Sequence, residues 1–476
     1  MPMRGWLAPF VYLSSNWISL IGVVLTTTGG LLWLILLPSM IRGSARDPYL
    51  GILQFMVLPA IFFAGLALIP LGIWSYKKRN RGALPEVFPP LDLSNPRFRR
   101  LLAFIAVTTL ANIVIGAQFT YRAMHYMETV SFCGQTCHTV MKPEFTAYQN
   151  SPHSRVACVE CHIGAGANWF VKSKISGSWQ VVSVAFNLYP RPIPTPIENL
   201  RPARETCEVC HWPQKYGGDA IRVRSSFTDD EQTKELKTVL LLHIGGGNGY
   251  RGIHGAHMGP GVEIRYAHSD PRRTKIPWVE YSRGNERRIY MAEGYSSDSP
   301  GSLPVRVMEC IDCHTRPSHS FDLPERAIDK ALLANEVDRS LPFVRKAALE
   351  VMKQDYKTEA EALAEVPRRF IAYYEKNHPA VMSSKRAAVE SSAKAVLAAF
   401  SRNVFPDMNV KWGYYINNIG HTDFDGCFRC HDERGATAGD RTITQDCDTC
   451  HKILAQEEES PKVLADLGLA QTAGKQ

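Results

Sequence analysis

The chain has 476 residues, a length that suggests two to four domains, and 45% of its residues are hydrophobic. Its formal net charge is +8, but much of the basic excess lies in one segment near the N-terminus, and the remaining charges are mixed. Since no basic stripe is present, the composition argues against nucleic acid as a partner.

Three uncharged apolar stretches, 17–38, 51–76 and 101–121, come first in the chain. Each is long enough to cross about 30 Å of hydrocarbon as a helix, and none shows the polar face of a core helix. A cleaved signal peptide would have a shorter apolar region and a small-residue cleavage site. We therefore predict three transmembrane helices that form a membrane anchor over residues 1–122.

The charges between these stretches predict the orientation in the membrane. The segment after the first stretch contains only Arg42 and Arg46 as basic residues. The positive-inside rule places the more basic segment 77–100 in the cytoplasm. The N-terminus is then cytoplasmic, and the chain after about residue 122 lies in the periplasm, outside a bacterial inner membrane. The basic residues of the segment 77–100 are Lys77, Lys78, Arg79, Arg81, Arg97, Arg99 and Arg100.

Twelve cysteines follow the apolar region, and ten of them form five C-x-x-C-H motifs. In this motif the two thiols add to the vinyl groups of haem as thioethers, and the adjacent histidine binds the iron. Zinc sites rarely place a histidine after each second cysteine, disulfides follow no such rule, and thioredoxin-like sites need a βαβ setting. The sequence therefore predicts covalently attached c-type haem at Cys158, Cys161 and His162; Cys207, Cys210 and His211; Cys310, Cys313 and His314; Cys427, Cys430 and His431; and Cys447, Cys450 and His451.

The last two cysteines form a related motif with one additional spacer residue. Cys133 and Cys137 flank Gly134 and two further residues, and His138 follows. Both thiols still reach the vinyl groups if the loop bulges, which glycine permits. We therefore predict a sixth haem with His138 as its proximal ligand. Met141 is the favoured second ligand, because methionine raises the potential of a haem.

Second axial ligands are expected among the nine histidines outside the motifs, because low-spin electron-transfer haems usually take histidine or methionine. His153, His319 and His421 each lie in a turn-rich stretch close to a motif. We predict that they bind iron, each at its own or at a neighbouring haem.

The glycine-rich segment "HIGGGNGYRGIHGAHMGPG" supplies further candidates. His243 and His254 flank its glycines, and His257 is the alternative to His254. The segment lacks the G-K-[ST] ending of a phosphate-binding loop. His268 lies in a turn and is expected to face solvent, whereas His378 is expected at the C-terminus of a helix.

The rest of the chain predicts a mainly α, loop-rich periplasmic haem domain with a small β-rich insert. Residues 123–215 carry three motifs and an amphipathic stretch, 167–189, that suits a helix either on the membrane surface or packed on haem. Residues 216–306 read as short strands that form an insert supplying distal ligands. Residues 307–476 carry three more motifs and four helical patterns between 324 and 402, and the tail after the last motif looks mobile.

Residues 127–215 resemble the NapC/NirT/NrfH family of membrane-anchored multihaem cytochromes. The matching residues are "METVSFCGQTCHTVMKPEFTAYQNSPHSRVACVECH" and "RPARETCEVCHWP". The family commonly has one membrane helix and four or five haems, and its methionine follows the motif histidine at two positions instead of three. The longer arrangement of this chain, a triple-span anchor joined to a NapC/NirT-like segment, resembles the inner-membrane multihaem cytochromes of metal-reducing bacteria.

The resemblance implies electron transfer from membrane quinol, menaquinol or ubiquinol, to a periplasmic cytochrome or reductase. The first motif follows the third apolar stretch closely, so its haem is expected near the lipid headgroups. Quinol oxidation needs a proton acceptor, for which His125, Glu128, Lys142 and Glu144 are candidates. The alternatives are a terminal reductase of a small nitrogen compound or oxyanion, which needs a haem with an open site, and an electron-transfer subunit of a larger respiratory complex.

Overall fold

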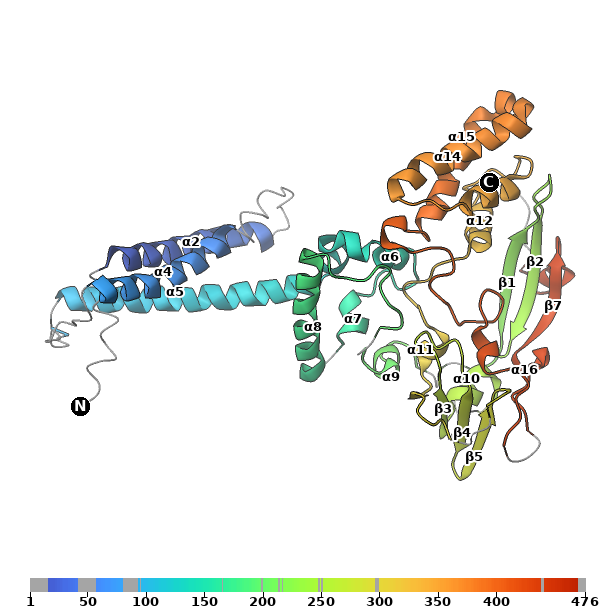
Figure 1. Cartoon of the computed structure of the whole chain (residues 1–476), viewed down its shortest axis with the longest axis horizontal. Coiled ribbons are helices and arrows are strands. Elements are labelled where there is room, and N and C mark those ends of the chain that lie inside the picture. The colour runs from blue at the N-terminus through green and yellow to red at the C-terminus, as the bar shows by residue number, and fades with distance from the viewer. Residues whose placement is uncertain are drawn as a thin grey trace. The chain divides into compact units, whose positions relative to one another are not determined.

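The computed structural model describes residues 16–41, 57–79, 93–94 and 96–469, apart from 165, 198–199, 213–214, 216, 247–248, 250, 296–298 and 438–440. The chain divides into two compact units, Met1–Met127 and Glu128–Gln476 (Figure 1). We call the first the anchor unit and the second the motif unit, because all twelve cysteines lie in the second.

Within the described residues, the anchor unit contains α2 (Trp17–Ile41), α4 (Leu58–Arg79) and α5 (Pro96–Met127). These helices coincide with the three apolar stretches. Helices α2 and α4 approach closely, because a Cβ atom on Gly65 would lie 2.5 Å from Thr26 Oγ1. Of the helices described, α4 is long and apolar enough to cross a membrane, and Trp17–Trp33 is a shorter apolar stretch. Three crossings therefore remain a prediction. The prediction of orientation also used Arg42, Arg46 and Arg81. These three residues lie outside the described residues.

The four helices predicted between residues 324 and 402 are confirmed. They are α12 (Pro324–Leu333), α13 (Val344–Met352), α14 (Glu359–Asn377) and α15 (Pro379–Ser401). Local sequence sets their starts: Pro324 occupies the first turn of α12, and the Thr358 hydroxyl accepts the Glu361 N–H at the start of α14. Their apolar faces meet in a core that includes the fully buried Ile328, Leu332 and Phe370. This core is independent of any cofactor.

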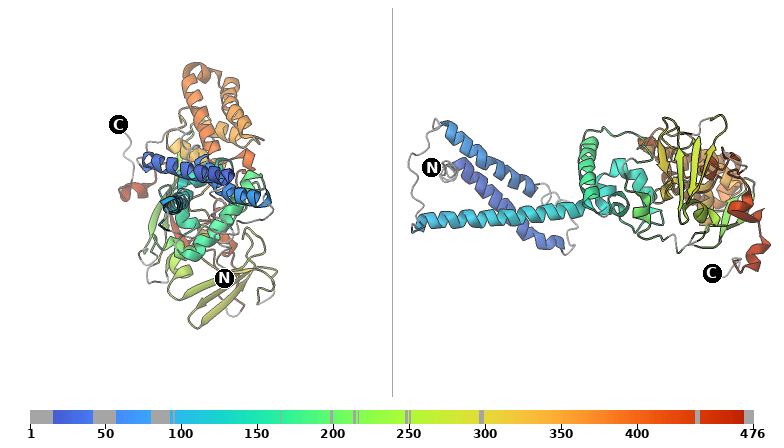
Figure 2. Two further views of the ribbon diagram at one scale, coloured as in Figure 1. Left: turned by 90° about the vertical axis from the view of Figure 1, so that its left-hand side faces the viewer. Right: turned by 90° about the horizontal axis from the view of Figure 1, so that it is seen from below.

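All five strands predicted between residues 216 and 306 are also confirmed, and they contribute to two antiparallel sheets. One sheet has the order β1 (Ala220–Phe227), β2 (Glu235–Leu242), β7 (His451–Glu458). The other has the order β5 (Glu286–Met291), β4 (Trp278–Arg283), β3 (Val262–Ala267), β6 (Val305–Val307), and Figure 2 shows it in yellow-green from two further sides.

The prediction of a mobile tail is wrong for residues 453–458, because they belong to strand β7. Lys452 and Ile453 pair with Leu241 and Leu240 of β2, and Ala455 is buried against Val239. Figure 1 shows β7 beside β2. The open edge of β2 offers unpaired backbone groups to this segment. The last motif is thereby fixed to the β-rich part of the motif unit.

Short helical elements carry or flank the motifs. Their bounds are η2 (Phe132–Thr136), α6 (His138–Gln149), α7 (Cys158–His162), α8 (Ala167–Ala185), α9 (Ala203–Cys207), α10 (Gly252–Met258), α11 (Cys310–Cys313), η4 (Pro406–Met408), η5 (Gly426–Arg429), α16 (Cys447–Cys450) and α17 (Lys462–Asp466).

Candidate haem-binding sites

Each regular motif folds as, or directly after, a single helical turn: α7, α9, α11, η5 and α16. The two cysteines of a motif are three residues apart, which places them on the same side of such a turn. Backbone bonds close the turns, for example from the His211 N–H to the Cys207 carbonyl (2.8 Å) and from the His314 N–H to the Cys310 carbonyl (2.8 Å). All twelve cysteines lie among the described residues, and none of them forms a disulfide. This local fold presents two thiols and an adjacent imidazole together.

The first motif folds differently, and its fold accommodates the additional spacer residue. Residues Phe132–Thr136 form one turn of π-helix, η2. A π-turn arises where a helix takes up one extra residue, so the wider spacing of Cys133 and Cys137 still fits a helical turn. Gly134 is buried, and a Cβ atom there would lie 2.2 Å from Cδ2 of Phe145. Glycine is required here because no side chain fits beside the Phe145 ring. Backbone conformation is not the reason, since the φ angle of Gly134 is not positive.

Replacing Gly134 by alanine is therefore expected to reduce haem attachment at the first motif. The added methyl group overlaps the Phe145 ring, and overpacking of this kind typically costs about 1–3 kcal/mol. Gly177 in α8 is the matched control, because a Cβ atom there meets nothing within 4 Å. Mass spectrometry of the peptide that contains Cys133 and Cys137 measures the attached fraction. Equal attachment in Gly134→Ala and Gly177→Ala would contradict the role of Gly134.

The histidine of every regular motif faces one histidine from outside the motifs. The pairs, with the distance between ring centroids, are His162 and His319 (6.2 Å), His211 and His153 (6.0 Å), His314 and His254 (6.3 Å), His431 and His257 (5.8 Å), and His451 and His421 (6.2 Å). The structure thus brings five of the candidate distal histidines to motif histidines.

These distances fit one metal atom between the two rings. With metal–nitrogen bonds of about 2.0–2.1 Å, two imidazoles on opposite sides of one metal have ring centroids about 6 Å apart. Haem iron takes four ligands from the porphyrin and needs only two from the protein, which is what each pair supplies. No three side chains of His, Cys, Asp or Glu in the described part of the chain converge as a protein-only metal site requires.

The environment of these histidines favours the form that binds metal. Burial lowers the pKa of His162, His257 and His319, because it removes water from the charged imidazolium. They are therefore kept neutral, as a metal ligand must be. In four of the paired histidines, Nδ1–H can donate a hydrogen bond to a backbone carbonyl, which leaves Nε2 free to bind metal. They are His153 (Pro317, 3.3 Å), His257 (Ile253, 2.7 Å), His319 (Glu144, 3.0 Å) and His431 (Thr444, 2.8 Å).

Three of the pairs join a histidine beside one motif to the histidine of another motif. His153 precedes the second motif but faces His211 of the third, and His319 follows the fourth but faces His162 of the second. His421 likewise precedes the fifth motif but faces His451 of the sixth. Each flanking histidine therefore ties two motifs together.

One short helix provides two of the five partners. The second half of the glycine-rich segment forms α10, and His254 and His257 lie three residues apart on it. Residues at this spacing are neighbours on a helix surface. They face His314 of the fourth motif and His431 of the fifth, so the structure places both candidates beside motif histidines and not one in place of the other.

The rings of three other histidines, the candidate ligand His243 and the non-candidates His268 and His378, lie against other groups. Nδ1 of His243 lies 3.0 Å from Oδ1 of Asp219, and the ring of His378 stacks on Phe343. Nδ1 of His268 lies 2.9 Å from the Asp270 carbonyl oxygen. The His268 ring also lies beside Tyr266, and the backbone N–H of His243 donates to the Cys450 carbonyl of the sixth motif (2.9 Å).

The ligands of the first motif are described only in part. The side chain of His138 lies outside the described residues. Met141 and Cys137 pack against the same apolar cluster, which includes Val140, Met408 and Tyr415. Met141 as a ligand therefore stays a prediction.

Three of the four candidate proton acceptors form ion pairs in the motif unit. Glu128 lies 3.6 Å from Lys174, and Lys142 pairs with Glu359. Glu144 Oε2 accepts a hydrogen bond from Arg316 (2.6 Å) and lies 3.4 Å from Nδ1 of His319. Glu144 thus supports a candidate iron ligand, a role that the sequence alone did not reveal. His125 belongs to the anchor unit, where its ring stacks on Tyr121.

The six motifs contact one another in the order of the sequence. The Cys133 and Cys158 side chains lie close together, and helix α9 of the third motif packs against α11 of the fourth. These contacts join the first motif to the second and the third to the fourth.

The remaining neighbours are joined by backbone elements. Helix α7 of the second motif packs against α9 of the third. Arg429 of the fifth motif donates to the Asp312 carbonyl of the fourth (2.7 Å), and His431 bonds to Thr444, just before the sixth. Groups attached to the motifs therefore lie beside one another in succession.

Comparison with known proteins agrees with these sites. The family model for the N-terminal region of NapC/NirT cytochromes c matches residues 96–191. The cytochrome c-type protein ImcH of Geobacter sulfurreducens is 38% identical over 452 residues, which cover 94% of this chain and 89% of ImcH. The cytochrome c-type protein NrfH of Wolinella succinogenes is 35% identical over 95 residues, 19% of this chain and 52% of NrfH. No solved structure matches. The chain belongs to the NapC/NirT family of membrane-anchored c-type cytochromes, which carry covalently bound haem.

Proposed function

We propose that the chain is a hexahaem quinol dehydrogenase that passes electrons from the membrane to a periplasmic cytochrome or reductase. The observation that carries the proposal is the unbroken succession of motifs, with a facing histidine at each regular one. One quinol, menaquinol or ubiquinol, loses two electrons and two protons as it becomes quinone. When bound, haem iron supplies the one-electron chemistry by cycling between the ferric and ferrous states.

The chain's own residues would hold the iron atoms in this scheme. The five facing pairs give each regular motif two axial imidazoles, and His138 with Met141 would serve the first. With both histidines of a pair bound to iron, no coordination position would stay open for a substrate, so the five pairs favour electron transfer over a terminal reductase. Electrons would pass in motif order and leave near Cys447 and Cys450.

Helix α8 supports a location of the motif unit on the outer surface of a bacterial inner membrane. Its side chains Val171, Ile175, Trp179 and Phe186 are exposed and recur at helical spacing, which gives one apolar stripe. Lys172 lies over the Trp169 ring of the same helix, the combination expected of an interfacial helix. The orientation with a cytoplasmic N-terminus and a multi-pass anchor belongs to the same proposal.

Hydroxyl-radical footprinting of the protein in lipid nanodiscs tests this placement. Trp179 and Phe186 are expected to be protected from oxidation, because lipid covers the stripe on α8. Trp212 is the matched control: it is 56% exposed and lies outside α8, so it should be oxidised. Equal oxidation of Trp179 and Trp212 would overturn the location on lipid.

The proton acceptor of quinol oxidation remains among His125, Glu128, Lys142 and Glu144. The acceptor is a base that reaches the quinol hydroxyl by a hydrogen bond, directly or through water. Replacing each residue singly, with glutamine for glutamate, and measuring the pH profile of quinol oxidation assigns the role.

Anaerobic mixing of the purified holoprotein with menaquinol and with ubiquinol tests the proposed function. Haem absorbance is expected to show reduction by at least one of the two quinols. An unchanged, fully oxidised spectrum with both would overturn the proposal. A high-spin haem that binds small ligands, seen by electron paramagnetic resonance at a regular motif, would favour the reductase instead.

A further inference from the structure

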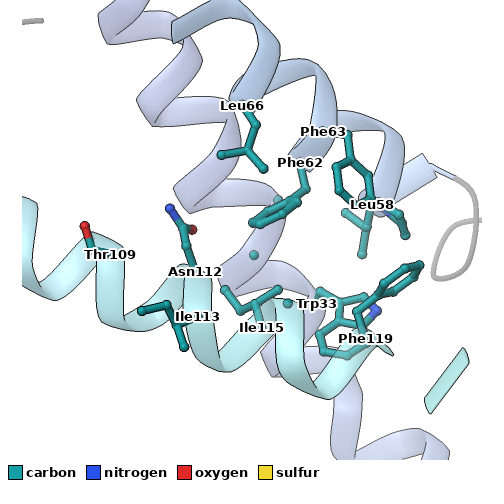
Figure 3. A pocket seen from close by; sticks show the side chains of 14 residues that line it. Trp33, Leu58, Phe62, Phe63, Leu66, Thr109, Asn112, Ile113, Ile115 and Phe119 are labelled. Carbon is teal, nitrogen blue, oxygen red and sulfur yellow. The ribbon is translucent and has the colours of Figure 1, made fainter. Parts of the chain in front are cut away.

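The anchor unit contains a cavity of about 510 Å³ between α2, α4 and α5. Aromatic and aliphatic side chains dominate its wall, among them Trp33, Phe62, Phe63, Ile115 and Phe119 (Figure 3). The volume lies in the range of sites that enclose a small organic molecule.

Two polar atoms in the wall of this cavity are buried without a hydrogen-bond partner among the described residues. They are Nε1 of Trp33, whose residue is only 4% exposed, and Oδ1 of Asn112. One is a donor and the other an acceptor. Leaving a buried polar group unpaired costs about 1–3 kcal/mol, so a ligand that pairs with both atoms is stabilised here.

The two atoms come from opposite ends of the cavity. The Trp33 ring contacts Phe119 (centroids 6.2 Å apart), and Asn112 lies seven residues earlier on α5, beside Leu66 in Figure 3. At 1.5 Å per residue, this separation is about 10 Å along the helix. A hydroquinone ring with a hydrogen bond at each of its opposite oxygens spans about the same length.

The position of the cavity along the three helices also suits a membrane electron donor. The wall is formed by residues between Gly29 and Trp33 in the second half of α2, between Leu58 and Leu66 in the first half of α4, and between Thr109 and Phe119 from the middle of α5 onward. Helix α5 ends at Met127, and the first motif begins at Cys133. The cavity therefore lies toward the end of the bundle from which the chain enters the motif unit.

We propose that this cavity binds the ring of the membrane quinol, with Asn112 Oδ1 accepting from one hydroxyl group and Trp33 Nε1 donating to the opposite oxygen. The apolar wall then packs on the ring and the first part of the isoprenoid tail. This inference rests on the proposed quinol oxidation and adds the site at which the quinol binds.

Three substitutions in the cavity test the site. Asn112→Leu removes the acceptor, and Trp33→Phe removes the N–H donor but keeps an aromatic ring beside Phe119. Gly116→Leu fills the cavity, because a Cβ atom at Gly116 meets nothing within 4 Å. Trp74→Phe is the matched control, since Trp74 lies on α4, is 61% exposed and does not line the cavity.

The full-length, haem-loaded protein in nanodiscs is measured in two ways. One is equilibrium binding of oxidised menaquinone with a single isoprenoid unit, and the other is the KM for haem reduction by its quinol. Asn112→Leu and Trp33→Phe are expected to raise both the Kd and the KM about tenfold, as for one lost buried hydrogen bond. Gly116→Leu is expected to abolish binding, and Trp74→Phe to leave both values unchanged.

The outcomes separate this site from the proposed function. Normal binding and normal KM in all three cavity variants would overturn the site, even if quinol reduces the wild-type haems. Quinone binding that is lost in the variants would support the site, even if no quinol reduces the wild type and the proposed function fails.

Discussion

Replacing His254 and His257 together by alanine is expected to convert two haems from low-spin to high-spin. Each ring faces the histidine of a regular motif, at centroid distances of 6.3 and 5.8 Å. Alanine leaves the sixth coordination position of both irons without a protein ligand. Loss of an axial ligand also shifts the potential of each haem, by an amount on the order of 0.1 V.

Electron paramagnetic resonance of the oxidised protein measures this change. The single variants should each produce half of the high-spin signal, with His254→Ala acting at Cys310 and Cys313 and His257→Ala at Cys427 and Cys430. His268→Ala is the control, because Nδ1 of His268 bonds to Asp270 and its ring faces Tyr266 and no motif histidine. An unchanged low-spin spectrum in the double variant would refute the assignment of both ligands.

Replacing Glu144 by alanine is expected to cause the second large effect. The Glu144 carboxylate and the Arg316 guanidinium are 13% and 9% exposed and lie 2.6 Å apart. Removing one partner of a buried ion pair costs about 3–5 kcal/mol, because the other charge stays buried without compensation. Arg316 also donates to the His319 carbonyl (2.7 Å), so the loss reaches the segment that holds a predicted iron ligand.

The urea concentration at which the low-spin spectrum is lost should fall strongly in Glu144→Ala and less in Glu144→Gln, which keeps a hydrogen bond. Glu359→Ala is the matched control, because the Lys142–Glu359 pair is exposed and such pairs contribute at most about 1 kcal/mol. A fall of similar size in Glu144→Ala and Glu359→Ala would show that the Arg316 contact does not stabilise this region.

Local patterns were sufficient to predict much of the fold. Proline and capping residues mark the starts of α12 and α14, and alternating β-formers mark β1 to β5, so local chemistry agrees with the tertiary structure there. Strand β7 was missed because its sequence is acidic and polar. Its conformation depends on the free edge of β2, more than 200 residues earlier, and no local signal records that contact.

The candidate haem sites were likewise predictable only in part. The motif cysteines and histidines could be identified from their spacing, because covalent chemistry fixes that spacing. Which distal histidine serves which motif could not be identified, since it depends on long-range packing. His319 faces His162 across 157 positions of sequence, and Glu144 supports His319 from a helix that follows the first motif. The π-turn at the first motif was also outside local prediction, although the requirement for glycine pointed to the right position.

The mass of the purified, denatured polypeptide tests the central claim most directly, because thioether bonds survive denaturation and acid. The account predicts the mass of the bare chain plus six haem groups. Peptide mapping should find one haem on each pair of motif cysteines, including Cys133 and Cys137 with their wider spacing. A polypeptide at the mass of the bare chain, or one without haem on the peptide of the first motif, would contradict it.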